Sequence, residues 1–210
     1  MKKNYVTFYL FIAVIGTAFQ ASAQLAYEEI TAAYKSSYQY EKTENYTDAI
    51  KSIMVVYNHY EESYTVNLRL AYLFLQQGQY ANASRHYQNA QKALPSSVSP
   101  KLGLMTVALA QLQYDKAEEI GFNILKIDKY NYYANLKLAY ALNQNKKYDN
   151  AETIVEKMLA FYPEDVSFLS QYAAIFAAQS LFIQATEYYS TVLILDPENI
   201  NANYYFSLAK

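Results

Sequence analysis

The sequence predicts an all-α solenoid, made of about five copies of a 34-residue helix–turn–helix unit and closed by a C-terminal helix. Three observations predict this fold class. Alanine recurs at intervals of 34 residues, apolar residues inside each unit recur every three or four positions, and the 210-residue chain contains only 4 Gly and 4 Pro. Spacings of three and four residues are typical of a packed helix, and so little Gly and Pro argues against a loop-rich all-β protein.

The first element, residues 1–23, is expected to be a secretory signal peptide. Two lysines precede an apolar run over residues 5–19, and Ala21 and Ala23 provide the small side chains of an Ala-x-Ala cleavage site. This pattern predicts export to the periplasm. The alternative is an uncleaved inner-membrane anchor, because residues 4–26 carry no charge and are long enough to span a bilayer.

Five units of equal length follow. Each contains an aromatic residue and, three positions later, an alanine: Ala49, Ala83, Ala117, Ala151 and Ala185. This register divides the array, residues 24–210, into units over 30–63, 64–97, 98–131, 132–165 and 166–199. Prolines occupy one shared position near the end of three units: Pro95, Pro163 and Pro197. A period of this length is typical of stacked helical repeats.

In this pattern the chain resembles the tetratricopeptide repeat (TPR) family. The unit of that family has an aromatic residue, an alanine, a second aromatic residue and a closing proline at fixed offsets. The second unit matches these positions best, with Leu70, Ala71, Phe74, Gly78, Tyr80, Ala83, Tyr87, Ala90 and Pro95. The resemblance covers residues 30 to about 210. It implies a right-handed superhelix with an extended concave face.

Two parts of the array depart from the family pattern. In the third unit Met105 stands at a position that is usually small and Gly121 at one that is usually large, so we expect the two exchanges to compensate across one helix interface. The first unit matches worst, as expected of a terminal repeat that needs a polar outer face. Residues 200–210 match only the opening helix of a sixth unit and are expected to cap the array.

The composition excludes most catalytic and metal sites. With no Cys, 2 His and isolated glycines, the chain lacks thiol chemistry, Cys-ligated zinc and a phosphate-binding loop. The adjacent carboxylates of Glu118 and Glu119 are expected on a solvated face, because neighbouring helix residues do not face each other. We therefore expect no enzyme activity, no metal and no cofactor. A formal net charge of −2, together with export, argues against nucleic acid as a partner.

The resemblance also implies which residues line the concave face, because in the family five positions of each first helix point inward. In this chain those positions are rich in Tyr and Leu and poor in charge. The candidate binding residues are Tyr34, Tyr38, Leu68, Tyr72, Leu75, Leu102, Leu109, Tyr133, Leu136, Tyr140 and Asn143. The Lys, Asn and Arg residues with which the family clamps a terminal carboxylate are replaced by Tyr34, Tyr38, Arg69, Ser99 and Gly103. That clamp is therefore not expected.

These features predict a non-catalytic protein–protein interaction scaffold of the bacterial cell envelope. Its partner would be an apolar or aromatic-rich peptide or helix laid in the concave groove, in a process such as secretion, pilus assembly or outer-membrane assembly. One alternative is a structural protein that self-associates into a homo-oligomer, and another is a protein that binds cell-wall glycans on its tyrosines. Membrane contact is expected only if the N-terminal segment stays uncleaved.

Overall fold

The computed structural model describes residues 25–208. The expected signal peptide, residues 1–23, lies outside the described residues, as does nearly all of the alternative anchor, residues 4–26. The described part folds into helices without strands, namely α1 (Tyr27–Glu41), α2 (Tyr46–Tyr57), α3 (Tyr64–Gln76), α4 (Tyr80–Ala93), α5 (Ser99–Ala110), α6 (Tyr114–Leu125), α7 (Tyr132–Gln144), α8 (Tyr148–Leu159), α9 (Val166–Ala178), α10 (Phe182–Leu195) and α11 (Ile200–Leu208). Within residues 25–208, none of these helices is long and apolar enough to cross a membrane.

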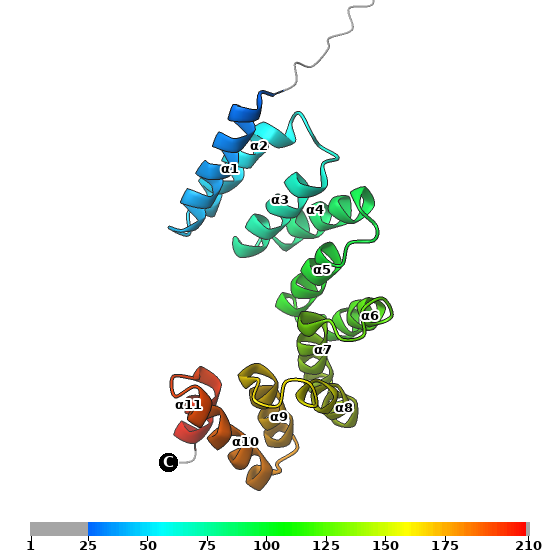
Figure 1. Ribbon diagram of the computed structural model, residues 1–210, viewed down its shortest axis with the longest axis vertical. Helices are drawn as coiled ribbons and strands as arrows, with labels where there is room; N and C mark the ends of the chain where they lie inside the picture. Colours follow the sequence, from blue (N-terminus) through cyan, green and yellow to red (C-terminus); the bar gives the residue numbers. More distant parts are fainter. Residues whose placement is uncertain (1–24, 209–210) are drawn as a thin grey trace, which may run out of the picture.

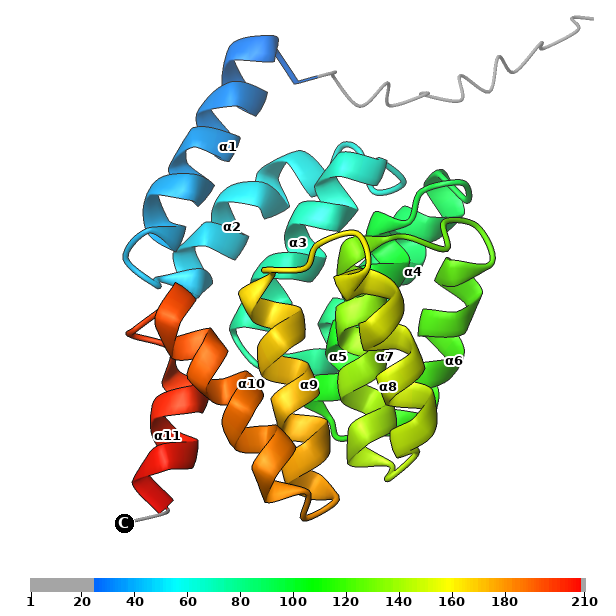
Figure 2. The ribbon, with the colours of Figure 1, turned by 60° about the horizontal axis from the view of Figure 1, so that its bottom comes forward.

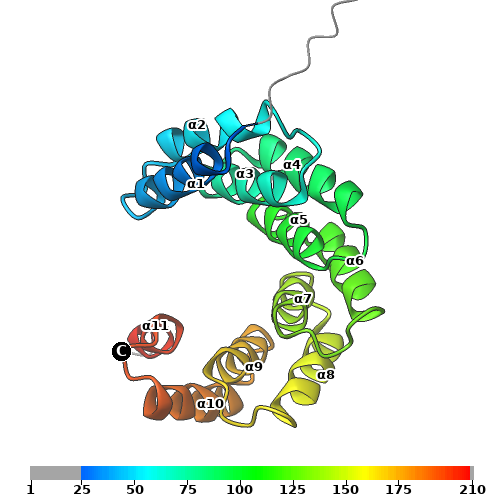
Figure 3. The same ribbon diagram turned by 45° about the horizontal axis from the view of Figure 1, so that its top comes forward.

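Successive helices pair into hairpins that stack along an arc (Figure 1). Figure 2 shows two neighbouring pairs, α7 with α8 and α9 with α10, lying side by side. Figure 3 shows the arc as an open C, with the odd-numbered helices on its inside and the even-numbered helices α2 to α10 on its outside. The expected all-α repeat solenoid is thereby confirmed. The inner, concave face consists of the first helix of every unit together with α11.

Each hairpin turns through one residue in the left-handed backbone conformation. These residues recur at the same repeat position: Glu44 (φ 56°), Gly78 (φ 75°), Leu112 (φ 57°), Lys146 (φ 58°) and Ser180 (φ 63°). Only glycine adopts this region without a steric penalty. Four of the five turns therefore use a residue type that disfavours the conformation they all share.

The expected exchange of sizes in the third unit is confirmed. Met105 on α5 is completely buried, and its side chain fills the space that Gly121 on α6 leaves open. A Cβ atom added to Gly121 would lie only 2.9 Å from Met105 Cε. The large side chain and the missing one therefore complement each other across one interface, and the interior stays packed.

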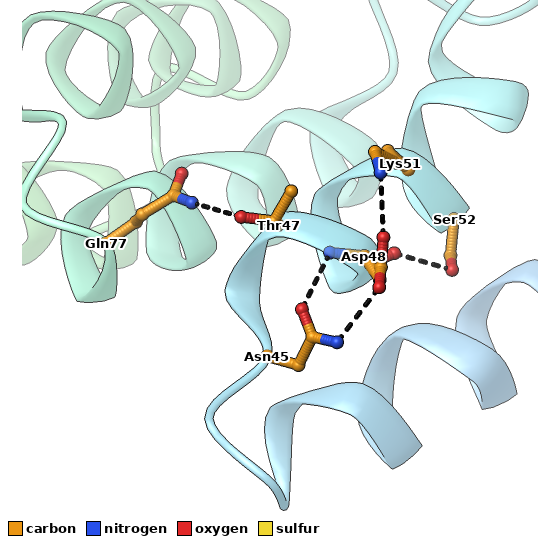
Figure 4. A network of polar contacts seen from close by, with 6 residues as sticks. All are labelled: Asn45, Thr47, Asp48, Lys51, Ser52 and Gln77. Carbon is orange, nitrogen blue, oxygen red and sulfur yellow. Dashed lines mark hydrogen bonds and ion pairs between the residues drawn. The ribbon is translucent and has the colours of Figure 1, made fainter.

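Polar contacts join neighbouring hairpins along the solenoid. Figure 4 shows Asn45, whose Oδ1 accepts the Asp48 N–H at 3.2 Å and so caps the N-terminus of α2. Close to this cap, the side-chain amide of Gln77, which follows α3, donates to Thr47 Oγ1 at 2.8 Å. This second bond connects the first hairpin to the next one.

The expectation that Glu118 lies on a solvated face is wrong. Glu118 is buried, with 6% of the residue exposed, while Glu119 is exposed. Lys147 Nζ donates to Glu118 Oε2 at 2.7 Å, and Asn145 Nδ2 donates to Oε1 at 2.6 Å. Adjacent residues on a helix point about 100° apart, so one of the two carboxylates faces the next hairpin and the other faces solvent.

The interior is divided into three clusters that follow one another along the arc. The first extends from Ala49 to Val107, the second from Met105 to Ile175, and the third from Leu169 to Ala202. Each cluster is shared by adjacent hairpins, as expected where a repeat buries its apolar surface against its neighbours.

Candidate functional site

The concave face contains two adjoining hollows. The first has a volume of about 750 Å³ and lies between α1, α3 and α5, with α7 at its far edge. The second has a volume of about 520 Å³ and lies between α7, α9 and α11, with α5 at its near edge. Lys137 on α7 lines both, so the two hollows form one groove that continues across α7.

All eleven residues predicted for the groove line one of the two hollows. The first hollow is lined by Tyr34, Tyr38, Leu68, Tyr72, Leu75, Leu102 and Tyr133, and the second by Leu109, Leu136, Tyr140 and Asn143. Tyr38 and Tyr133 are more than half exposed, whereas Asn143 is almost fully buried. The side chains that are available to a ligand are therefore mainly the tyrosine rings and the half-buried leucines.

Arg69 gives the first hollow its charge, and that charge is neutralised inside the protein. Its Nε and Nη2 donate to Ser37 Oγ at 3.1 and 2.9 Å, and its Nη1 pairs with Glu41 Oε2 at 2.5 Å. The guanidinium also stacks over the Tyr38 ring, with 3.9 Å between Cζ and the ring centroid. Around Arg69 the first hollow therefore presents aromatic and apolar surface, and its cation without an ion-pair partner among the described residues is Lys137, at the far edge on α7.

Tyr87 reaches the groove from the outer helix α4, which sequence reasoning did not foresee. Its ring passes Gly103 on α5 so closely that an added Cβ atom would collide with Tyr87 Cε1. Burial raises the pKa of the Tyr87 hydroxyl to about 12, so the ring stays neutral. The sequence signal was the isolated glycine within a helix, which is typical of close packing against another group.

The second hollow is more polar than the first. Its lining includes Ser170, Asn199 and Asn201 beside Tyr140 and Leu136. Two buried polar atoms on this face, Asn143 Oδ1 and Gln171 Nε2, have no hydrogen-bond partner among the described residues. Unpaired buried polar atoms are uncommon in folded proteins, so these two mark a part of this face whose hydrogen bonding is incomplete.

The groove offers binding groups and no catalytic constellation among the described residues. Burial is the main cause that raises the pKa of both Tyr72 and Tyr140, which therefore remain neutral donors at physiological pH. Over residues 25–208, no cluster of His, Asp and Glu side chains could hold a metal ion. The arrangement is thus suited to contact with a ligand surface.

Comparison with known proteins finds relatives by structure alone. No protein-family model matches the chain, and no curated protein matches it in sequence. Among solved structures, a MamA protein is similar with a TM-score of 0.65 and 14% identity, over 79% of this chain and 91% of that one.

Two further solved structures share the same architecture. A tetratricopeptide repeat protein from Parabacteroides merdae ATCC 43184 has a TM-score of 0.71 and 14% identity, over 82% of this chain and 68% of that one. TTC0263, a thermophilic TPR protein of Thermus thermophilus, has a TM-score of 0.69 and 13% identity, over 85% of this chain and 97% of that one. At these identities the likeness establishes the fold.

Proposed function

From the premise that the chain has the tetratricopeptide repeat fold, we propose that it is a non-catalytic interaction scaffold whose concave groove holds a peptide or helix of a partner protein. The observation that carries this proposal is the continuity of the groove. Two hollows meet at α7 and together are lined by all the Tyr and Leu residues predicted for the inner face. A fold of this kind uses its extended concave surface for binding.

The lining indicates what kind of segment the groove suits. Tyr72, Tyr133 and Tyr140 each expose more than a third of their surface, beside leucines that are half-buried. Tyrosine contributes a large contact area at a low cost in side-chain entropy and retains a polar tip, which makes it a good anchor at interfaces. An apolar or aromatic-rich segment would bury its side chains between these rings.

We further propose that the protein works in the bacterial cell envelope. This part of the proposal is supported by the sequence pattern of residues 1–23, which predicts export to the periplasm. Secretion, pilus assembly and outer-membrane assembly are the processes in which an exported peptide-binding scaffold would serve. Fractionation of cells into periplasm, membrane and cytoplasm, with detection of the full chain and of its N-terminus, tests both localisation and cleavage.

The groove is tested by crosslinking inside the cell. A photoreactive residue replaces Tyr72 in the groove, and a matched variant carries it at Gln88, which is exposed on the outer helix α4. We expect one envelope protein to be captured from position 72 and not from position 88. Equal capture at both positions, or capture at neither, would contradict the proposal.

One observation favours self-association as a second function. Ile183, Ile194 and Ile200, at the C-terminal end of the array, are 84%, 79% and 83% exposed, and Glu187 is the one charged residue within 166–195. Apolar side chains this exposed, on a segment with so little charge, favour contact with another protein surface. Light scattering during size-exclusion chromatography tests the idea. A dimer that becomes a monomer in the Ile183→Asp, Ile194→Asp double variant would support it, and a wild-type monomer at high concentration would exclude it.

A further inference from the structure

The groove contains two cations at the same repeat position, and only one of them has a partner among the described residues. Arg69 is the sixth residue of α3 and Lys137 the sixth residue of α7. The surrounding sequences are nearly identical, since residues 67–72 read Asn-Leu-Arg-Leu-Ala-Tyr and residues 135–140 read Asn-Leu-Lys-Leu-Ala-Tyr. Both residues line the groove, so the surroundings of Arg69 can be compared directly with those of Lys137.

The partners of Arg69 come from the preceding inner helix. Ser37 and Glu41 on α1 lie across from Arg69 and satisfy its guanidinium. The corresponding positions on α5, 68 residues later, are occupied by Met105 and Leu109. Beside Lys137, apolar side chains therefore occupy the positions of the carboxylate that neutralises Arg69 and of the hydroxyl that accepts its hydrogen bonds.

Lys137 consequently has no counter-charge in the described structure. Among residues 25–208 no acidic side chain forms an ion pair with it, and it is half-buried between α5 and α9. Burial lowers the pKa of its ammonium group, as expected for a cation that is partly removed from water without compensation. Removing a charge from water without a partner is unfavourable, so an incoming anion would be stabilised here.

A second unpaired donor belongs to a residue that lines the same hollow. Gln171 is the sixth residue of α9, one unit after Lys137, and its buried Nε2 has no acceptor among the described residues. Both side chains line the second hollow. A carboxylate oxygen is an acceptor that suits both an ammonium group and an amide N–H, and its charge favours the ammonium group of Lys137.

We propose that Lys137 binds an acidic side chain, Asp or Glu, of the segment that occupies the groove. This inference rests on the proposed function and specifies the partner chemistry. The groove continues on both sides of Lys137, towards Tyr72 and Leu102 in one direction and Tyr140 in the other. The acidic residue therefore lies within the bound segment, flanked by apolar residues, rather than at its C-terminus.

The test selects ligands from a displayed library of random peptides and measures the binding of resynthesised, end-blocked peptides. Each selected peptide is compared with its Glu→Gln or Asp→Asn version, on the full-length wild-type protein and on Lys137→Met. We expect the amide peptide to bind wild type at least about tenfold more weakly, and to bind Lys137→Met as well as the acidic peptide does. Lys116→Met, which removes an exposed lysine on α6, is the matched control and should retain the preference.

The possible outcomes separate the two proposals. Peptides that bind the groove without a preference for an acidic residue would overturn the role of Lys137 and leave the groove as the binding site. A library that yields no groove-binding peptide would overturn the proposed function and this inference with it. A thermal melt completes the test, because a Lys137→Met protein that melts below wild type would mean that Lys137 stabilises the fold instead of serving a ligand.

Discussion

His86 shows how a single buried side chain is fixed in one protonation state. Its ring is 1% exposed and stacks on Phe74 with 5.4 Å between ring centroids. The Asn67 amide nitrogen donates to two backbone carbonyls, so its Oδ1 is the acceptor and His86 Nδ1 must carry the proton that joins them at 2.9 Å. A second proton would have to sit on Nε2, which faces the Arg85 guanidinium at 3.4 Å.

This environment predicts a specific loss of stability in acid. Burial first, and the Arg85 charge second, lower the pKa of His86 from 6.5 to about 4. The unfolded chain therefore binds a proton below pH 6.5 that the folded chain accepts only near pH 4. The contribution of neutral His86 to the free energy of unfolding is complete above pH 6.5 and is lost as the pH falls towards 4. We expect the proton bound by His86 in the unfolded chain to lower the free energy of unfolding in acid by up to about 3 kcal/mol, relative to a protein without this histidine.

Urea unfolding of wild type and His86→Gln at a series of pH values measures that contribution. Because carboxylates also take up protons in acid, the quantity of interest is the difference in the free energy of unfolding between the two proteins. The difference should narrow as the pH falls from 6.5 to 4. His59→Gln, at an exposed position just beyond α2, is the matched control and should parallel wild type. Parallel curves for His86→Gln would show that the buried ring does not resist protonation.

At the scale of the element, the hairpin turn is the most regular feature of the fold. All five turns place the same repeat position at a φ between 56° and 75°, although the residue is glycine only at Gly78. A left-handed conformation costs a residue with a Cβ atom roughly 1–2 kcal/mol. The other four turns tolerate this cost because the helices on both sides pack against each other and fix the connection.

Leu112→Gly should therefore stabilise the protein. The Leu112 side chain is 68% exposed, so its removal sacrifices little packing, while its φ of 57° would become unstrained. Allowing for the greater freedom of glycine in the unfolded chain, we expect a gain of about 0.5–1 kcal/mol in denaturant unfolding. The reciprocal change, Gly78→Ala, should lose a similar amount. A Leu112→Gly variant that is no more stable than wild type would argue that this turn is not strained.

The 34-residue period made the helical hairpins and the inner-face positions predictable, because a period reports which residues share a face. It could not show what lies across from each of those residues. Arg69 and Lys137 look equivalent in sequence, and only the packing of α1 against α3 reveals that Glu41 neutralises the first. The left-handed conformation of the turns could not be predicted either, because only one of the five turn residues, Gly78, is a glycine. Glu118 was mispredicted because its partner, Lys147, belongs to the next hairpin.

At the scale of the whole molecule, the solenoid is a chain of local contacts. The principal helix contacts join helices of the same or adjacent hairpins, and the three core clusters follow one another along the arc. In such a protein each interface stabilises mainly the hairpins that form it. A disturbance at the N-terminal end should therefore loosen the first hairpin without reaching the last one.

The ion pair between Glu41 and Arg69 provides the means to test this locality. The Arg69 side chain is 7% exposed and that of Glu41 24%, so Glu41→Gln leaves a largely buried cation without its counter-charge. We expect the docking of α1 and α2 to weaken by about 1–3 kcal/mol. Hydrogen exchange followed by mass spectrometry should then accelerate in residues 27–57, by about tenfold for each 1.4 kcal/mol, and stay unchanged in residues 166–208.

Lys51→Gln supplies the control within the same hairpin. It breaks an ion pair with Asp48 in which the lysine side chain is 72% exposed, and exposed pairs of this kind contribute little. Its exchange pattern should match that of wild type. If Glu41→Gln instead accelerated exchange equally along the whole array, the hairpins would have to unfold as one cooperative unit. The groove could then not open at one end to admit a ligand while the other end stays folded.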